Sequence, residues 1–303
     1  MRTETTWGFA EGDEIVSGLH AVELLGGGRR YEAYVAWDDD RLAPVVVKIV
    51  RPQLVSKPGP LGGLAGEARM LAATDHPNIV RSFGAQLDGP RPHLVLEYLD
   101  GPRLSTLIRR HGLAVEQVLS LALELSSALH YLSAREIVHL DVKPRNIIMV
   151  ASPRLIDLSV AMPLADVPTI REPIGTDAYM APEQGVPERY AEIGPATDVW
   201  GLGVTLFEAL AHYLPFPQPS EDPSAPLSER YPQIVKEPFA LPGGVPVALG
   251  DVVRASLEKR PENRPRADEL HRTFEPWVAN LPRPRIGLFR PGGRIRTGVF
   301  ELA

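Results

Sequence analysis

Short apolar runs separated by turn residues dominate the first hundred residues of the chain. Three consecutive glycines at 26–28 and three consecutive aspartates at 38–40 bound two of these runs. Such a pattern predicts a hairpin-rich antiparallel sheet. The spacing of Leu64, Ala68 and Leu71 is instead helical, and it predicts one helix over residues 61–73. The expected strands lie at residues 31–37, 44–50, 79–86 and 93–98.

Beyond residue 102 the apolar positions follow a helical period. Val115, Leu119, Ala122 and Leu129 fall on one stripe, which predicts a long buried helix over residues 115–132. The chain therefore has an α+β pattern, with a small sheet first and a mainly helical part after it. The later elements expected are a ribbon at 147–150 and 154–156, a buried helix at 196–213, a proline-rich loop at 215–226 and small helices to about residue 280.

Composition narrows the class of protein. The 303 residues are 44% hydrophobic and 23% charged, which is typical of a globular protein and long enough for two packed lobes. The absence of cysteine excludes a disulfide frame, a thiolate zinc site and a thiol nucleophile. The net charge of −6 argues against a nucleic-acid partner.

Neither the start of the chain nor its most apolar helix has the character of a membrane segment. Residues 1–14 carry Glu4, Glu11, Asp13 and Glu14 without an apolar core, unlike a signal peptide. The predicted helix at 115–132 is interrupted by several polar residues and is too polar to span a bilayer. We expect a cytoplasmic protein without a membrane span.

The strongest chemical signal lies in the middle of the chain. Residues 139–146 have the pattern H-x-D-x-K-x-x-N, and Asp157-Leu158-Ser159 and Ala181-Pro182-Glu183 follow at intervals that suit phosphoryl transfer. In that chemistry Asp141 accepts the proton of the attacking hydroxyl. Asn146 and Asp157 hold the Mg²⁺ (or Mn²⁺) ions that bridge the phosphates of ATP.

Two features of the sheet region fit the same chemistry. Lys48 ends an apolar strand, and a buried lysine needs a partner, which Glu67 on the next helix can supply. The pair would present the ammonium to the α- and β-phosphates of ATP. Residues 25–28 (Leu25, Gly26, Gly27 and Gly28) would cover the phosphates, although Tyr31 replaces the third glycine of the template G-x-G-x-x-G.

With these motifs, the chain resembles the bacterial eukaryotic-like (Hanks-type) Ser/Thr protein kinases over roughly residues 15–280. The resemblance implies a bilobal kinase fold and a protein as the phosphate acceptor. It implies that Lys143 neutralises the γ-phosphate and that Thr176 bridges Asp141 and Lys143. It further implies that Glu183 pairs with Arg264 and that Asp198 caps the backbone of the catalytic loop.

The resemblance also assigns an ATP slot. Leu96 would be the gatekeeper, the backbones of Glu97 and Leu99 would bind adenine, and Ile148 would form the floor. Ala33 and Val46 would form the roof, where the family usually has valine and alanine, and a larger residue that faces a smaller one would keep the total volume. Two departures concern switching: Leu140 stands where many members have arginine, and Ser159 replaces the glycine of D-F-G.

The domain boundaries expected from the resemblance are an N-terminal extension at 1–14, a kinase domain at 15–280 and an arginine-rich tail at 281–303. The lobes would cover about residues 15–99 and 100–280. The tail is either a solvated or lobe-docked segment or a docking and autoregulatory one.

Three functions are compatible with these residues. The first is an active Ser/Thr protein kinase in bacterial signalling, using ATP and Mg²⁺ on protein substrates, with a homodimer as a possible assembly. The second is a pseudokinase that binds ATP as a regulatory scaffold, which the irregular glycine loop and Ser159 would suit. The third, a small-molecule kinase, is disfavoured by Lys143 and the full segment 175–183.

Overall fold

The computed structural model describes residues 5–187 and 193–281, and these residues form two compact units. The first unit comprises the chain up to Asp100 together with Asp157–Met162. The second comprises Gly101–Ile156 and the chain from Pro163 onward. The five arginines of the predicted tail, from Arg283 to Arg296, lie outside the described residues.

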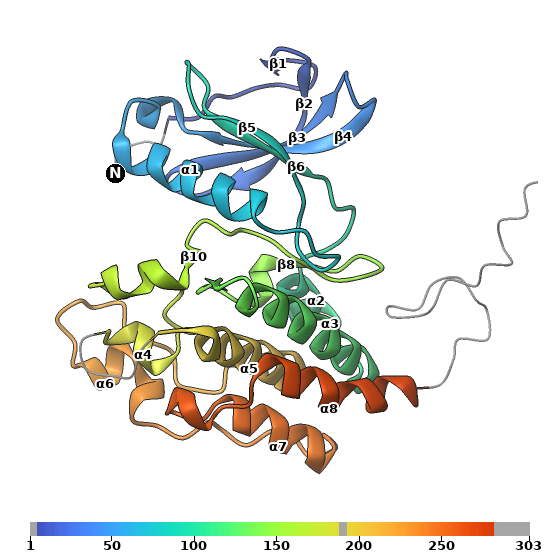
Figure 1. Cartoon of the computed structure of the whole chain (residues 1–303), viewed down its shortest axis with the longest axis vertical. Coiled ribbons are helices and arrows are strands. Elements are labelled where there is room, and N and C mark those ends of the chain that lie inside the picture. Colours follow the sequence, from blue (N-terminus) through green and yellow to red (C-terminus); the bar gives the residue numbers. More distant parts are fainter. Residues whose placement is uncertain (1–4, 188–192, 282–303) are drawn as a thin grey trace, which may run out of the picture. The chain divides into compact units, whose positions relative to one another are not determined.

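A six-stranded antiparallel sheet forms most of the first unit, with the strand order β1-β2-β3-β4-β6-β5 (Figure 1). One α-helix, α1, joins β4 to β5 in the chain. The elements are β1 (Glu14–Val16), β2 (Leu19–Gly27), β3 (Tyr31–Asp38), β4 (Ala43–Val50), the 3₁₀ turn η1 (Pro52–Leu54), α1 (Pro58–Ala72), β5 (Ser82–Gln86) and β6 (His93–Glu97).

Two boundaries differ from the sequence prediction by three residues. Helix α1 begins three residues before the predicted start, because Pro58 and Pro60 occupy its first turn. Proline is tolerated there, since the N–H groups of the first turn have no partner within the helix. Strand β5 begins at Ser82, three residues after the predicted start at Ile79.

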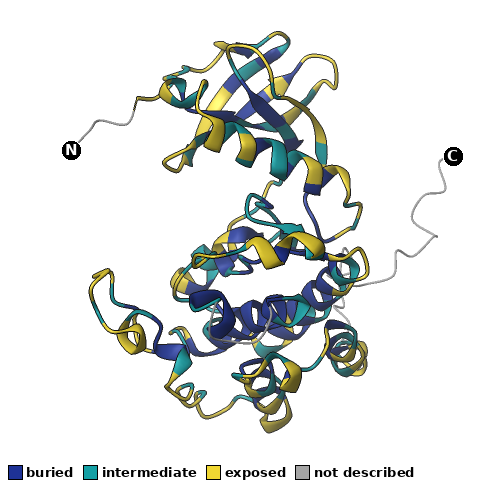
Figure 2. Cartoon of the chain, turned by 60° about the vertical axis from the view of Figure 1, so that its left-hand side comes forward, coloured by how far each residue is buried: buried dark blue, intermediate teal, exposed yellow. Residues whose placement is uncertain are grey.

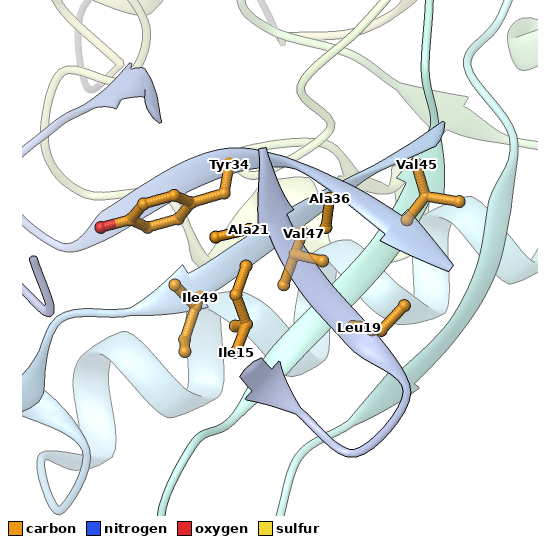
Figure 3. Close-up of a cluster of buried hydrophobic side chains, with 8 residues drawn as sticks. All are labelled: Ile15, Leu19, Ala21, Tyr34, Ala36, Val45, Val47 and Ile49. Carbon is orange, nitrogen blue, oxygen red and sulfur yellow. The ribbon is translucent and has the colours of Figure 1, made fainter. Parts of the chain in front are cut away.

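The two faces of the sheet are different because side chains alternate along each strand. One face holds a buried apolar cluster from β1 to β4, on which Trp7 and Phe9 pack (Figure 3). The other face carries the side chains of Ala33, Val46 and Lys48, which the strand register places together. The members of the cluster are Ile15, Leu19, Ala21, Tyr34, Ala36, Val45, Val47 and Ile49.

A buried ion pair connects the N-terminal segment to the sheet. Glu32 is 2% exposed, and its carboxylate accepts hydrogen bonds from the Arg51 guanidinium at 3.0 Å and the Tyr34 hydroxyl at 2.8 Å. Arg51 also donates to the backbone oxygens of Thr5 and Gly28. The same guanidinium therefore holds the N-terminal segment and the glycine turn (Gly26, Gly27 and Gly28) in place.

Helices form most of the second unit, and the buried helices α3 and α5 lie at its centre (Figure 2). Helix α3 packs on both α5 and α8, and α5 packs on α7. The helices are α2 (Leu104–Arg110), α3 (Val115–Ser133), α4 (Pro182–Gly185), α5 (Pro195–Ala211), α6 (Leu227–Arg230), α7 (Val247–Ser256) and α8 (Ala267–Ala279). The short elements are β7 (Ile137–Val138), η2 (Pro144–Asn146), β8 (Ile147–Ile148), β9 (Arg154–Leu155), β10 (Met162–Pro163, at the unit boundary), η3 (Leu164–Thr169), η4 (Pro232–Ile234) and η5 (Pro261–Asn263).

Two glycines let α5 approach its neighbours closely. A methyl group on Gly201 would lie 2.9 Å from the carbonyl oxygen of Val142, and one on Gly203 would lie 2.8 Å from the Cβ of Ser256. Glycine at 201 therefore brings the helix against the loop that contains the H-x-D motif. Among the described helices, none is long and apolar enough to cross a membrane.

The antiparallel sheet with one helix, followed by a mainly helical unit, confirms the predicted α+β fold class. The ribbon predicted near residues 147–156 is present as the antiparallel pair β8 and β9.

We predict that Arg51→Met destabilises the protein by about 3–5 kcal/mol, because it leaves the Glu32 carboxylate buried without its cation. Arg254→Met is the control. Arg254 and its partner Asp251 are 57% and 61% exposed, so the loss should stay within about 1 kcal/mol. Urea unfolding measures both. Equal losses in the two variants would contradict the assignment.

Candidate active site

Lys48 lies at the centre of a charged cluster in the first unit. Its ammonium donates to both carboxylate oxygens of Glu67, at 2.9 and 2.7 Å, and to Oδ1 of Asp157 at 2.9 Å. The predicted pair of Lys48 and Glu67 is therefore present. The contact with Asp157 was not predicted, because 109 residues separate the two in sequence and no local pattern signals such a contact. We call Lys48, Glu67 and Asp157 the Lys48 cluster.

The Lys48 cluster contains two carboxylates for one ammonium. Burial by itself would lower the pKa of Lys48, but the charges of Glu67 and Asp157 outweigh it and raise the pKa above its ordinary value. Burial, together with the charge of Asp157, raises the pKa of Glu67 against the opposing effect of Lys48. With both carboxylates ionised, the cluster has one negative charge in excess, and a cation near Asp157 would be stabilised there.

Asp157 begins a short segment that belongs to the first unit although its neighbours in sequence belong to the second. Its φ of 67° lies in the left-handed region, which is unusual for a residue with a side chain and recurs at functional sites. Ser159 does not have a positive φ, so serine adopts its backbone conformation without the strain that would demand glycine.

The glycine turn joins β2 to β3 and is held by backbone contacts. The N–H of Gly28 donates to the carbonyl of Tyr31 at 3.0 Å, and Arg51 donates to the carbonyl of Gly28 at 2.7 Å. A methyl group on Gly27 would lie 2.7 Å from the Tyr31 carbonyl, and Gly26 has a φ of 132°. Glycine is therefore required at positions 26 and 27. The neighbouring Leu25 is 47% exposed.

Several residues of the predicted ATP slot share the face of the sheet that carries Lys48. Val46 pairs with both Val35 and Leu96, and Ala33 pairs with Lys48. Ala33 and Val46 are therefore diagonal neighbours on that face and not direct partners. The prediction that Ala33 and Val46 face each other is wrong, because Val35 of β3 lies opposite Val46.

The remaining slot residues lie at the end of the first unit and in the second. The N–H of Glu97 donates to the carbonyl of Arg81 at 2.9 Å, so Glu97 cannot offer that N–H to adenine. Leu99 follows in a non-regular segment. Ile148, the predicted floor, lies in β8 of the second unit and pairs with Arg154.

A second polar cluster, the Asp141 cluster, lies within the second unit and comprises Asp141, Lys143, Asn146 and Thr176. The Lys143 ammonium lies 2.5 Å from Oδ2 of Asp141 and 2.5 Å from Oγ1 of Thr176. The Thr176 hydroxyl donates to Oδ1 of Asp141 at 2.8 Å. The predicted bridge by Thr176 is present. In addition, Asn146 donates from Nδ2 to the backbone and side-chain oxygens of Asp141, both at 3.0 Å.

Asp198 of α5 holds the backbone before Asp141. Its carboxylate accepts hydrogen bonds from the N–H groups of His139 and Leu140, both at 2.8 Å, as the sequence predicted. Leu140 has a φ of 65°, and its carbonyl accepts a hydrogen bond from Gln184. His139 is fully buried, which agrees with a structural role for it in the loop. The strained backbone at Leu140 is thus held from both sides.

A buried ion pair anchors the segment that follows Thr176. Arg264 donates to both carboxylate oxygens of Glu183, at 2.6 and 2.9 Å, and both side chains are 0% exposed. The Thr197 hydroxyl also donates to Glu183. The predicted pair is present, and its bidentate geometry fixes the end of the segment against the helices.

One contact near the Asp141 cluster gave no signal in the sequence. The Tyr179 hydroxyl donates to Glu208 of α5 at 2.6 Å. Burial raises the pKa of Glu208 above its ordinary value of 4.5, and the hydrogen bond from Tyr179 opposes this only in part. Burial and the nearby Glu208 also raise the pKa of Tyr179, so the phenol keeps its proton and remains the donor. Only the packing of α5 reveals this pair.

We predict that the Glu208 carboxylate gives the stability of the protein a pH dependence. The native protein takes up the Glu208 proton at a higher pH than the unfolded chain does. The free energy of unfolding, relative to a Glu208→Gln variant, should therefore rise as the pH falls through the native pKa and level off below about 4.5. Urea unfolding of both proteins from pH 7 to 4 measures this difference, and a constant difference would contradict it.

The comparisons with known proteins bear on this arrangement. The family model described as protein kinase domain matches residues 19–278. The chain is 31% identical over 255 residues to the serine/threonine-protein kinase PknB of Mycobacterium leprae, a match that covers 80% of the chain and 40% of that protein. It is 32% identical over 239 residues to the serine/threonine-protein kinase PkaA of Streptomyces coelicolor, covering 75% of the chain and 42% of that protein.

A third relative is the serine/threonine-protein kinase Pkn1 of Myxococcus xanthus, which is 32% identical over 283 residues, covering 90% of the chain and 40% of that protein. The chain thus spans about two fifths of the length of the curated relatives it matches. These matches confirm the resemblance to the bacterial Ser/Thr protein kinases that the motifs indicated. On the family model and the fold together, the chain belongs to the protein kinase domain family.

Proposed function

We propose that this protein is a Ser/Thr protein kinase that transfers the γ-phosphoryl group of Mg-ATP to a serine or threonine hydroxyl of a protein. The observation that carries the proposal is the Asp141 cluster. In it one carboxylate accepts a threonine hydroxyl at 2.8 Å, and an ammonium lies 2.5 Å from the same carboxylate. A carboxylate that accepts a hydrogen bond from one hydroxyl is placed to orient a substrate hydroxyl and to take its proton.

In the proposed reaction three residues of the Asp141 cluster orient the reacting groups or place charge beside them. Asp141 orients the attacking hydroxyl and accepts its proton. Lys143 places its ammonium beside the Asp141 carboxylate. There its positive charge would stabilise the negative charge of the phosphoryl group during transfer. Asn146 holds Asp141 in this orientation through two hydrogen bonds. The protein thus supplies positioning and charge, which is most of what phosphoryl transfer requires.

The Lys48 cluster would bind the phosphates of the nucleotide. The Lys48 ammonium is oriented by Glu67, so one charged donor is fixed in place. Asp157 and Asn146 carry the oxygen donors that Mg²⁺ prefers, and the negative excess of the Lys48 cluster suits a cation at Asp157. When bound, Mg²⁺ would neutralise charge on the phosphates.

The acceptor specificity and the setting of the reaction are part of the same proposal. Lys143 at its position favours serine and threonine over tyrosine as the acceptor, and the relatives bear the name of Ser/Thr kinases.

We further propose that residues 15–280 form the catalytic domain and that the protein acts in bacterial signalling in the cytoplasm. A homodimer remains a prediction. The pseudokinase alternative gains no support from the described contacts, because both clusters are complete.

We predict that Asp141→Asn lowers phosphate transfer by about 10²- to 10⁴-fold, because it removes the general base. The assay uses purified protein, labelled Mg-ATP and a generic protein acceptor, with identification of the phosphorylated amino acid. Asp251→Asn, which changes a 61% exposed carboxylate on α7, is the control and should retain activity. Absence of transfer from wild type and variant alike, on every acceptor, would disprove the kinase proposal in favour of the pseudokinase.

We also predict that Lys48→Met abolishes most of the thermal stabilisation by Mg-ATP, because a ligand stabilises only the state that binds it. Each variant is compared with its own ligand-free melting temperature, since the substitution leaves the buried Glu67 without its cation. Lys236→Met, at an exposed position, is the control. Equal Mg-ATP shifts in Lys48→Met and wild type would rule out Lys48 as a phosphate ligand.

A further inference from the structure

Tyr31 occupies the position of the third glycine of the G-x-G-x-x-G template, and its side chain lies over the Lys48 cluster. The ring centroid is 5.1 Å from the Lys48 ammonium. The hydroxyl donates to the carbonyl of Pro60, in the first turn of α1, at 2.8 Å. The side chain of Tyr31 therefore contacts the lysine of the cluster and the helix that carries Glu67, and its backbone carbonyl accepts the N–H of Gly28 in the glycine turn.

The strand register explains how Tyr31 reaches Lys48. Tyr31 pairs with Val50 and Ala33 pairs with Lys48, so Tyr31 and Lys48 are diagonal neighbours on one face of the sheet. A tyrosine ring is long enough to cover that diagonal distance. Its negative face attracts the ammonium, an interaction that strengthens when solvent is excluded. Glycine at position 31 could make neither contact.

Helix α1 has little stability of its own. It contains four glycines in 15 residues, and its first turn has neither a side-chain cap nor an acidic residue. Glycine in a helix interior costs roughly 1 kcal/mol relative to alanine. The position of Glu67 must therefore depend on contacts between α1 and the sheet, of which the Tyr31 hydrogen bond holds the first turn and the Lys48 ion pair holds the middle.

Only one of the four glycines has a steric reason to be glycine, and that reason is Tyr31. A methyl group on Gly63 would lie 2.6 Å from the Tyr31 hydroxyl oxygen and 3.9 Å from Cζ of the ring. A methyl group on Gly59, Gly62 or Gly66 would meet nothing within 4 Å. The surface of α1 is therefore shaped to receive this hydroxyl.

The hydroxyl also stays protonated. Burial raises the pKa of Tyr31 above its ordinary value of 10.0, and the charges of Glu67 and Asp157 act in the same direction, against Lys48 and Arg30. The phenol is thus a hydrogen-bond donor at every pH at which the protein would be assayed.

From these contacts we propose that Tyr31 is a positioning residue that fastens α1 to the glycine turn, so that Glu67 keeps the Lys48 ammonium oriented for the nucleotide. It replaces a flexible glycine with a fixed contact. The consequence for catalysis rests on the proposed kinase function, whereas the attachment of α1 does not.

The test is a double-mutant cycle between Tyr31→Phe and Gly63→Ala. Tyr31→Phe removes the hydroxyl and keeps the ring, and it should increase hydrogen exchange of the α1 amides by about 3- to 10-fold, the effect of one hydrogen bond. Gly63→Ala in the wild type should do the same by displacing the hydroxyl. In the Tyr31→Phe background Gly63→Ala should have no such effect, because 3.9 Å to Cζ is an ordinary contact.

Gly62→Ala is the matched control. It makes the same helix-favouring change one position away, at an exposed site where the new methyl group meets nothing within 4 Å. It should slow exchange in α1 in both backgrounds. If Gly63→Ala behaves like Gly62→Ala in the wild type, or if Tyr31→Phe leaves exchange in α1 unchanged, the proposal is wrong.

Kinetics separate positioning from mere packing. Tyr31→Phe should lower kcat/KM for ATP by about 3- to 10-fold while KM for the protein acceptor stays unchanged, since the Lys48 cluster serves only the nucleotide. Unchanged kcat/KM for ATP together with faster exchange would reduce Tyr31 to a structural contact and overturn the proposal. Exchange is measured without ATP, so it tests the attachment of α1 even if the protein transfers no phosphate.

Discussion

The ammonium of Lys48 cannot be left unpaired in the protein interior, and the first unit is arranged around this constraint. Three segments of the chain meet at Lys48: strand β4, helix α1 with Glu67, and the segment that begins at Asp157, 109 residues from Lys48. Removing an ammonium from water is costly unless carboxylates surround it. The ion pairs therefore place the segment from Asp157 to Met162 in the first unit, although both flanking parts of the chain belong to the second.

The same constraint organises the second unit. Arg264 and Glu183 are completely buried and satisfy each other through two hydrogen bonds. Asp198 is 4% exposed and accepts two backbone N–H groups. Buried ion pairs add little net stability, but they tolerate few geometries. Here the Asp198 carboxylate holds the loop before Asp141 and the Arg264–Glu183 pair holds the segment after Thr176, and so they bring Asp141, Lys143 and Thr176 together.

The departures from the family pattern become intelligible in this setting. Ser159 adopts a backbone conformation open to any residue. The backbone of Leu140 makes the polar contacts at this position: its N–H donates to Asp198 and its carbonyl accepts from Gln184. The leucine side chain is buried. Tyr31 gives the glycine turn a contact with α1 that a third glycine would lack. None of these residues removes a charged group from either cluster.

Local patterns in the sequence determined most of the fold. The alternation of apolar residues in β3 and β4 and the helical stripes of α3 and α5 follow from the periods of strands and helices, so their elements were predictable. The motif residues determined the chemistry of both clusters, because Asp141, Lys143 and Lys48 stand in patterns that few other functions use. Element ends were less certain, as the first turn of α1 shows, since prolines fit either a loop or a helix start.

Only the tertiary structure decided which distant groups meet. The contacts of Lys48 with Asp157, of Tyr179 with Glu208 and of Arg51 with Glu32 join separate segments of the chain. The relation of Ala33 to Val46 was likewise a matter of register, which the sequence left open. Side-chain periodicity tells which face a residue lies on, but the partner across a sheet or helix pair depends on how all elements pack at once.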